Sequence, residues 1–364
     1  MRKAAGRRSG RHGLLGRAVT LLLPLAAVAV SAHAQYAAGY AAAARLRPTQ
    51  IAVVVNEDLP DSVELGEYYV RARHVPKKNL VRVRIAGGPR KLLTAGEFAQ
   101  LKGQIEAKLD ASIQALVLVW TAPYAVECNS ITSALTLGFQ AKLCENTCAT
   151  SKVNPYFDAP DSRTIANYKM RLAMLLPTQS VEQTKALIDR GVQSDGSFPK
   201  GSAYFLETSD ASRSIRARFF PQTGRIANPP LELHNLRADS IENKHDVMFY
   251  FTGAVRVANL ETLQFLPGAV ADHLTSAGGD LLGDGQMSSM AWLEAGATAS
   301  YGTVSEPCNF WQKFPNPAVL LKHYLAGQTI IESYWKSVAW PAQGVFIGEP
   351  LASPYWRRTS TLAK

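Results

Sequence analysis

The residues best suited to chemistry stand together near the end of one predicted strand. Asp272 and His273 are adjacent, and Thr275 and Ser276 follow closely. An aspartate that orients a histidine, which in turn activates a hydroxyl, is the arrangement of a hydrolase. Neighbouring strand residues point to opposite faces, so Asp272 and His273 can share a pocket only if the strand has already ended. These polar residues therefore fit either a catalytic group or the side chains of a turn.

Other polar residues follow predicted strands and are candidates to line the same crevice. They are Asn56, Asp58, Thr252 and Glu306. Ligands and reactive groups of parallel α/β sheets gather at the carboxyl ends of the strands. The structural alternatives are an Asx turn at Asn56 and a salt bridge at Glu306.

The chain lacks the motifs of several common α/β functions. It has no G-x-G-x-x-G after a strand, no P-loop, no H-E-x-x-H and no G-x-S-x-G elbow. Asp280 and Asp284 stand in a glycine-rich loop, but such a short fragment does not predict a calcium site. We therefore expect no cofactor and no metal.

Apolar runs alternate with amphipathic segments through most of the chain. Strands are predicted over 51–55, 80–85, 113–120, 168–176, 203–207, 247–251, 267–273, 297–304 and 345–347. Helices are predicted over 63–72, 98–109, 181–192, 211–219, 288–294 and 317–326, and from a capping box at Thr329 and Glu332. The alternation predicts an α/β fold, a doubly wound and mostly parallel sheet with helices on both faces.

The first 34 residues have the three parts of a secretory signal peptide. Residues 1–17 carry six basic residues and no acid, and residues 18–30 are apolar. Ala32-His33-Ala34 is a cleavage site of the A-x-A type. Because the apolar run is too short to span a bilayer, we expect cleavage before Gln35 and no stable membrane span afterwards.

The mature chain has an ordinary charge. The whole sequence has 39 lysines and arginines against 29 acids, and loss of the leader reduces the excess to +4. No basic cluster with interleaved aromatics occurs in the mature part, so no nucleic-acid partner is expected. Residues 49–355 are expected to form one α/β domain, between a linker at 35–48 and a polar tail at 356–364.

Four cysteines are expected to form disulfides. They are Cys128, Cys144, Cys148 and Cys308, and the first three belong to an irregular insertion over about 124–165. An even number in an exported protein favours disulfides, and no histidine stands at zinc-site spacing. Three pairings are open. The short spacing favours Cys144 with Cys148, which leaves Cys128 for Cys308.

Two stretches carry a recognisable pattern. The first is Val53-Val54-Val55-Asn56 with Leu59-Pro60-Asp61-Ser62, Tyr68-Tyr69 and Val75-Pro76-Lys77-Lys78-Asn79-Leu80. The second covers 267–276 and 296–307, followed by Gly348-Glu349-Pro350-Leu351-Ala352. Together they resemble a secreted bacterial family, without an assigned reaction, from genomes that carry exosortase, a membrane enzyme proposed to sort surface proteins. The resemblance implies a periplasmic or extracellular setting in a Gram-negative bacterium.

The second half of the chain also shows a characteristic order of segments. They are Phe251-Thr252-Gly253, 266–275, 292–303 and Gly348-Glu349-Pro350-Leu351. This order is similar to that of gingipain-like cysteine peptidases of the caspase fold. The sequence has Thr252 where that family has its histidine, and Thr275 or Ser276 where it has its cysteine. The resemblance implies the fold, and the replaced thiolate and base imply loss of the peptidase chemistry.

Two functions follow. The first is a non-peptidase, caspase/gingipain-like domain that binds a peptide or glycan partner in the envelope, in exosortase-linked surface sorting. The alternative is an active hydrolase, a peptidase or esterase, that uses Asp272 and His273 with Thr275 or Ser276. Both depend on trailing loops that converge on one polar cleft. The sequence leaves open whether the protein is an enzyme.

Overall fold

The computed structural model describes residues 45–85, 88, 90–161, 163–178 and 180–357. The predicted signal peptide, most of the predicted linker and most of the polar tail lie outside the described residues. Within them, no helix is long and apolar enough to cross a membrane. The described chain is fixed from its start, because Leu46 is buried and its backbone N–H donates to Glu332 Oε2 at 3.1 Å.

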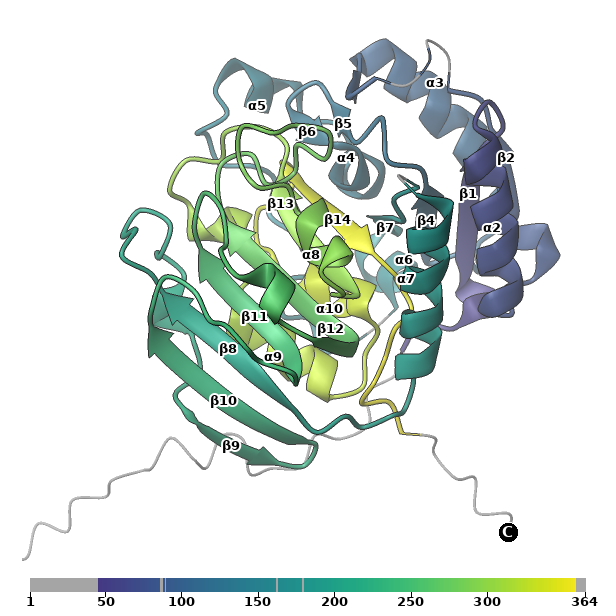
Figure 1. Ribbon diagram of the computed structural model, residues 1–364. Helices are drawn as coiled ribbons and strands as arrows, with labels where there is room; N and C mark the ends of the chain where they lie inside the picture. Colours follow the sequence, from purple (N-terminus) through teal and green to yellow (C-terminus); the bar gives the residue numbers. More distant parts are fainter. Residues whose placement is uncertain (1–44, 86–87, 89, 162, 179, 358–364) are drawn as a thin grey trace, which may run out of the picture. The chain divides into compact units, whose positions relative to one another are not determined.

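An eleven-stranded sheet forms the centre of the domain (Figure 1). From edge to edge it consists of β2 (Leu80–Val83), β1 (Ile51–Asn56), β4 (Ala115–Val119), β7 (Leu172–Leu175), β14 (Gly344–Gly348), β13 (Ala299–Thr303), β12 (Phe265–Leu274), β11 (Val247–Gly253), β8 (Gly201–Glu207), β10 (Pro230–Arg237) and β9 (Gly224–Ala227). Most neighbours are parallel, whereas β14 runs antiparallel to β13 and β9 to β10. The predicted α/β class with a mostly parallel sheet is confirmed.

Helices flank the sheet in two groups (Figure 1). The group over β1, β12 and β13 consists of α2 (Pro60–Ala72), α7 (Val181–Ser194) and α8 (Met290–Glu294). The second group consists of α4 (Ile131–Leu137) and α10 (Ile330–Ser337), which lie over β7 and β14, and α9 (Pro317–Leu325), which packs against α10 and contacts β11 through Tyr324 and Phe249. The remaining helices are α3 (Ala95–Glu106), α5 (Ala141–Glu145) and α6 (Thr164–Tyr168). A small second sheet joins β3 (Leu92–Leu93), β5 (Ala125–Val126) and β6 (Asn129–Ser130).

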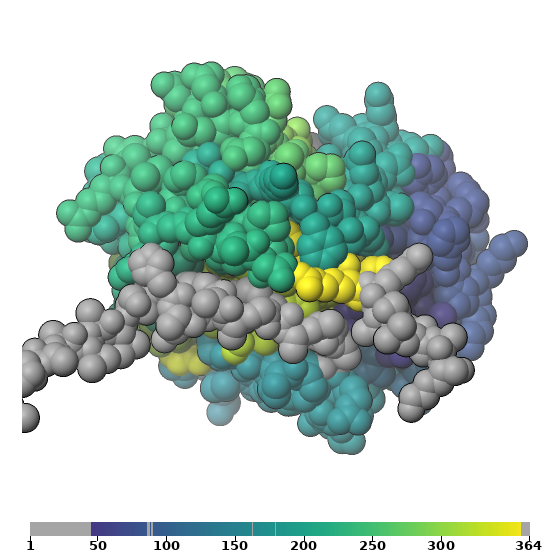
Figure 2. Space-filling model, turned by 90° about the horizontal axis from the view of Figure 1, so that it is seen from below, coloured from purple at the N-terminus to yellow at the C-terminus, as the bar shows by residue number. Residues whose placement is uncertain are grey.

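The last strand in sequence occupies the middle of the sheet. In Figure 2 the yellow C-terminal residues are visible between the purple and blue N-terminal part and the teal and green middle part. This placement agrees with the position of β14 between β7 and β13. The strand therefore joins the N-terminal strands to those from the middle of the chain.

Uninterrupted apolar runs explain why the central strands form. Every residue of β1, β4 and β7 is buried, as expected for parallel strands that are covered on both faces. Gly66 allows α2 to approach β1 closely, because a Cβ at this position would lie 2.1 Å from Val55 Cγ1. The predicted helix starts at Asn316 and at the Thr329–Glu332 capping box are both present.

One predicted element is wrong, and one hairpin was not predicted. Residues 211–219 form turns and a short 3-10 helix at Ala217–Phe219, because Asp210 binds Arg213 and the Arg216 side chain is drawn into the core. The hairpin of β9 and β10 was not expected. Its signal was an alternation in β10, where Leu231 and Leu233 are buried around exposed Glu232.

The four cysteines form two disulfides, but with a pairing other than the favoured one. Cys128 pairs with Cys144, and Cys148 pairs with Cys308. Cys144 lies on α5 against β6, whereas Cys148 follows a turn at Asn146, whose side-chain oxygen accepts the Cys148 backbone N–H at 3.0 Å. The chain has thus left α5 before Cys148, so short spacing did not bring Cys144 and Cys148 together.

Candidate functional site at the strand ends

The loops that follow β4, β12 and β13 meet at one edge of the sheet. The hydroxyl of Ser305, after β13, donates at 2.7 Å to the carbonyl oxygen of Cys128, which lies between β5 and β6 in the connection that follows β4. Asp280, after β12, is bound by Lys91 Nζ at 3.0 Å and by the hydroxyl of Tyr124. We call these connected segments the linked loops: residues 90–94, 120–130, 275–289 and 304–308, together with residues 254–257 after β11, which bond to the loop after β12.

The candidates after β1 make their contacts elsewhere. Asn56 Oδ1 accepts the backbone N–H groups of Asp58 at 3.2 Å and of Ile85 at 3.3 Å, so Asn56 forms the Asx turn that was its structural alternative. Asp58 pairs with Arg84 at 3.1 Å and lines a cavity of about 370 Å³ beside α3. The predicted site residues therefore form two groups instead of lining one cleft.

His273 is a buried, neutral histidine with both ring nitrogens in hydrogen bonds. It is 1% exposed. The indole N–H of Trp292 donates to Nδ1 at 2.9 Å, so the proton resides on Nε2, which donates to the carbonyl oxygen of Met287 at 3.0 Å. Burial lowers the pKa of His273 to about 4. No lone pair of the ring remains to accept a proton from a hydroxyl.

Asp272 points to the other face of β12 and pairs with Arg216. The carboxylate and the guanidinium are 2.6 Å apart, and each side chain is 1% exposed. Arg216 also donates to the carbonyl oxygens of Thr252 at 2.9 Å and Pro315 at 3.2 Å. Burial raises the pKa of Asp272 to about 6, while the charge of Arg216 opposes the rise. The structure thus separates Asp272 from His273, as strand alternation requires.

The hydroxyl of Thr275 and the backbone carbonyl oxygens of Thr275 and Ser276 are held by other polar groups. Thr275 Oγ1 donates to Gln286 Oε1 at 2.7 Å and accepts from Arg213 Nε at 3.2 Å. The carbonyl oxygens of Thr275 and Ser276 accept the hydroxyl of Thr303 at 3.2 and 3.0 Å. These bonds fix the turn after β12, which is the role that the structural alternative assigned to such residues.

Thr252 and Glu306 complete the set of predicted site residues. Thr252 lies beside His273 in the register of β11 and β12, but it is 1% exposed. Glu306 Oε1 accepts the backbone N–H of Cys308 at 2.7 Å, so this carboxylate caps its own loop. Among the described residues, no group of three or more metal-ligating side chains is suitably placed for a metal ion.

Sequence reasoning missed the partners that determine the state of these residues. Arg216, Trp292 and Gln286 come from segments far from β12 in the sequence or from its trailing loop. Arg216 stands between Arg213 and Arg218 in the sequence, so nothing in the pattern distinguished the buried arginine from its more exposed neighbours.

The linked loops carry three of the five large apolar side chains that are exposed in the described part of the chain. Leu92 is 48% exposed, Val255 39% and Leu282 47%. Leu92 follows Lys91, and Leu282 lies two residues beyond its partner Asp280. Val255 is tied to the same loop, because its carbonyl oxygen accepts the N–H of Met287 at 2.9 Å. We call these three residues the apolar loop surface.

Comparisons with known proteins concern the fold alone. No protein-family model matches the chain, and no curated protein matches it. One similar solved structure, described as a protease, is 11% identical with a TM-score of 0.48 and covers 85% of this chain and 79% of its own. A complex of the pro- and mature domains of Porphyromonas gingivalis RgpB is 10% identical with a TM-score of 0.43, over 84% and 79% of the two chains. A structure of the Arg-specific cysteine proteinase gingipain R (RgpB) is also 10% identical, with a TM-score of 0.43, over 85% and 79%.

Proposed function

We propose that the protein is an exported, non-catalytic binding domain that docks a peptide partner on its linked loops. The observation that carries the proposal is the state of His273. A general base needs a free lone pair within reach of the proton that it removes. The Nδ1 lone pair of His273 accepts the Trp292 N–H, and its Nε2 proton is given to Met287.

The bonds of Asp272 support the same conclusion. In a hydrolytic triad the carboxylate accepts the histidine N–H and stabilises the cation that forms. Asp272 instead pairs with Arg216 on the opposite face of the strand. The pKa of each residue has moved towards the neutral form through burial, which favours a packed core over an aqueous reaction centre.

The apolar loop surface is the proposed docking area. Leu92, Val255 and Leu282 are exposed on loops that other contacts hold in place, so little ordering is needed when a partner binds. The proposal requires these three side chains to present one apolar area to the partner, since contiguous exposed apolar patches are typical of interaction sites. Aliphatic side chains favour an apolar peptide over a glycan as the partner.

The proposed setting is the envelope of a Gram-negative bacterium. The leader sequence, the two disulfides and the resemblance to a family from exosortase-carrying genomes support export to an oxidising compartment. In this setting the domain would act as an accessory to surface-protein sorting, by holding a peptide segment rather than cutting it.

The docking surface is tested with peptides from a phage-displayed library that are selected on the mature protein. We expect selected peptides to bind at least tenfold more weakly to the variant Leu92→Ser/Val255→Ser/Leu282→Ser. The matched control Val153→Ser/Val192→Ser changes two similarly exposed residues and should bind like the wild type. Equal binding to both variants would place the partner elsewhere and contradict the proposal.

The absence of hydrolysis is tested separately. The folded protein should not be labelled by a serine-reactive fluorophosphonate, and a peptide library incubated with it should remain uncut by mass spectrometry. Labelling that disappears in both Ser276→Ala and His273→Ala, with the fold of each variant intact, would establish the hydrolase instead.

A further inference from the structure

The two disulfides lie in different hydrogen-bonding environments. In Cys128–Cys144, the backbone N–H of Cys128 donates to Cys144 Sγ at 3.3 Å. Asn129 Nδ2 donates to Cys128 Sγ at 3.2 Å and contacts Cys144 Sγ at 3.6 Å. Donors therefore point at both sulfur atoms of this bond.

The second disulfide shows the opposite arrangement. The backbone N–H of Cys148 donates to Asn146 Oδ1 at 3.0 Å, and that of Cys308 donates to Glu306 Oε1 at 2.7 Å. Oxygen atoms thus take the nearest donors of Cys148–Cys308. In the described part of the chain, no hydrogen bond is directed at either sulfur of this pair.

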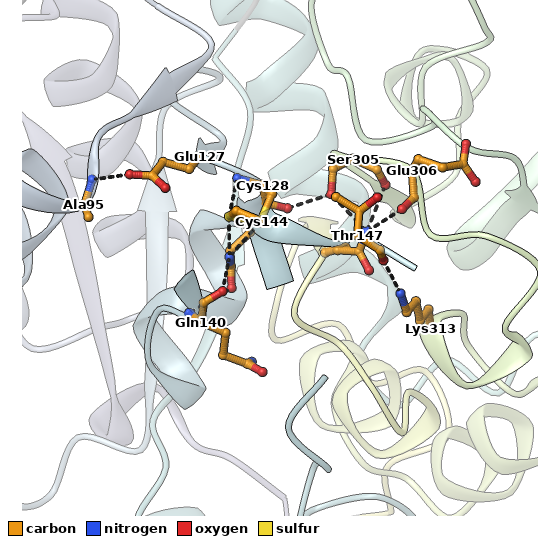
Figure 3. The surroundings of a disulfide bond; sticks show 11 residues. Ala95, Glu127, Cys128, Gln140, Cys144, Thr147, Ser305, Glu306 and Lys313 are labelled. Carbon is orange, nitrogen blue, oxygen red and sulfur yellow. Dashed lines mark hydrogen bonds between the residues drawn. A yellow bond between two sulfur atoms is a disulfide. The ribbon is translucent and has the colours of Figure 1, made fainter. Parts of the chain in front are cut away.

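The Asn129 side chain is fixed in the orientation that points its amide nitrogen at the sulfurs. Asn129 is fully buried. Its Oδ1 accepts the backbone N–H of Gln140 at 3.2 Å, and its Nδ2 donates to the carbonyl oxygen of Gln140 at 3.3 Å. Figure 3 shows Gln140 close to Cys128 and Cys144, with Ser305 bonded to Cys128. The two bonds to Gln140 determine which amide atom is nitrogen.

We propose that Cys128–Cys144 is a thiol–disulfide exchange site that is reduced by an external dithiol, whereas Cys148–Cys308 is a structural bond. N–H donors stabilise a thiolate more than a disulfide sulfur, so they favour the reduced form. A disulfide whose reduced form is stabilised has a higher reduction potential. Both Cys128 and Cys144 are partly exposed, so a dithiol can reach the bond.

The exchange balances as a two-electron reduction. One thiolate of the dithiol attacks Cys128 Sγ, the bond between the two cysteine sulfurs breaks, and its electron pair leaves on Cys144 Sγ. The second thiol of the reagent then displaces Cys128, which takes up a proton, and the dithiol becomes a disulfide. Cys144 remains as the thiolate beside the Cys128 N–H and Asn129 Nδ2, and the remaining proton goes to solvent.

The site is tested by equilibrating the mature protein in buffers with graded ratios of reduced to oxidised dithiothreitol. Alkylation of the free thiols and mass mapping then give the equilibrium constant of each disulfide. We expect Cys128–Cys144 to be reduced at a dithiol ratio at least tenfold lower than Cys148–Cys308, which corresponds to about 30 mV. Equilibrium constants that are equal, or in the reverse order, would overturn the proposal.

Two variants distinguish the effect of the Asn129 hydrogen-bond donor from the effect of side-chain packing. Asn129→Leu keeps the side-chain volume and removes the amide, so it should lower the equilibrium constant of Cys128–Cys144 about tenfold and leave Cys148–Cys308 unchanged. The control Asn146→Ala removes the acceptor beside Cys148 and should not affect Cys128–Cys144. An unchanged value in folded Asn129→Leu would also overturn the proposal. If Asn129→Leu does not fold, the order of the two bonds in the wild type still decides.

Discussion

Each face of β12 buries one titratable side chain, and the two side chains have different kinds of partner. On one face, Asp272 keeps its charge through an ion pair with Arg216, and the arginine also donates to two carbonyl oxygens. On the other face, His273 stays neutral between Trp292 and Met287. The comparison teaches that two adjacent polar residues at a strand end need not form a reactive pair, because each face supplies its own partner.

The ion pair is expected to give the largest effect when it is broken. Arg216→Met leaves the Asp272 carboxylate buried without a counter-charge and removes the donors to the carbonyl oxygens of Thr252 and Pro315, which should lower the free energy of unfolding at pH 7 by about 3–5 kcal/mol. Urea denaturation followed by circular dichroism measures the loss. The double variant Asp272→Leu/Arg216→Met removes both charges and should recover most of it. A loss below about 1 kcal/mol for Arg216→Met would show that the pair is not buried as described.

The pH dependence of stability separates the two faces. The pKa of His273 is lower in the folded chain, about 4, than in the unfolded chain, so its contribution is present at neutral pH and is lost as the pH falls to about 4. The pKa of Asp272 is raised to about 6, so its contribution has the opposite sign and is lost as the pH rises from about 4 to 6. The two slopes oppose each other in the wild type.

His273→Gln should reveal the pH dependence that His273 alone contributes to stability. The stability of the wild type relative to this variant should increase by about 1–3 kcal/mol between pH 4 and 6.5, because only the histidine slope has been removed. Chemical denaturation at half-unit pH intervals measures the difference. A difference that does not change with pH would mean that His273 is accessible to solvent.

Removal of the Trp292 N–H donor tests whether this hydrogen bond keeps His273 neutral. Trp292→Phe keeps an aromatic ring against Tyr250 but leaves His273 Nδ1 without its donor, at an expected cost of about 1–2 kcal/mol. The pKa of His273, followed by NMR, should rise because the neutral form has lost a hydrogen bond. An unchanged pKa would contradict the assigned tautomer.

Lys336 is a buried cation outside β12, and it tests how much a buried charge costs when no carboxylate pairs with it. Lys336 is fully buried over the ring of Tyr156, its Nζ has no hydrogen-bond partner in the described part of the chain, and burial lowers its pKa to about 8. We expect Lys336→Met to stabilise the protein by about 1 kcal/mol at pH 7. The gain should disappear above about pH 11.5, where the wild-type amine is neutral in both states, because the pKa of the unfolded amine is about 10.5. Destabilisation at pH 7 would show that Tyr156 compensates the charge fully.

The fully buried central strands were predictable because they are short uninterrupted apolar runs, as in Ile51–Val55 and Ala115–Val119, whereas β9 and β10 lack such a run. The starts of α9 and α10 were predictable because their capping side chains are local in sequence. Strand alternation also predicted correctly that Asp272 and His273 would diverge.

The rest depended on contacts between distant segments. Two side chains determine the protonation of Asp272 and His273. Arg216 lies on a loop whose predicted helix is replaced by turns, and Trp292 lies on α8. The disulfide pairing depended on where α5 ends, and no sequence spacing encodes that end. The donors at Cys128–Cys144 were hidden because Asn129 is one of three asparagines in the segment 124–165, and nothing in the sequence distinguishes it.

The central position of β14 has a consequence for how the molecule is made. While the ribosome extends the chain, β7 and β13 each present an open edge until residues 344–348 have been synthesised. The two halves of the sheet therefore join only after nearly the whole chain has been translated.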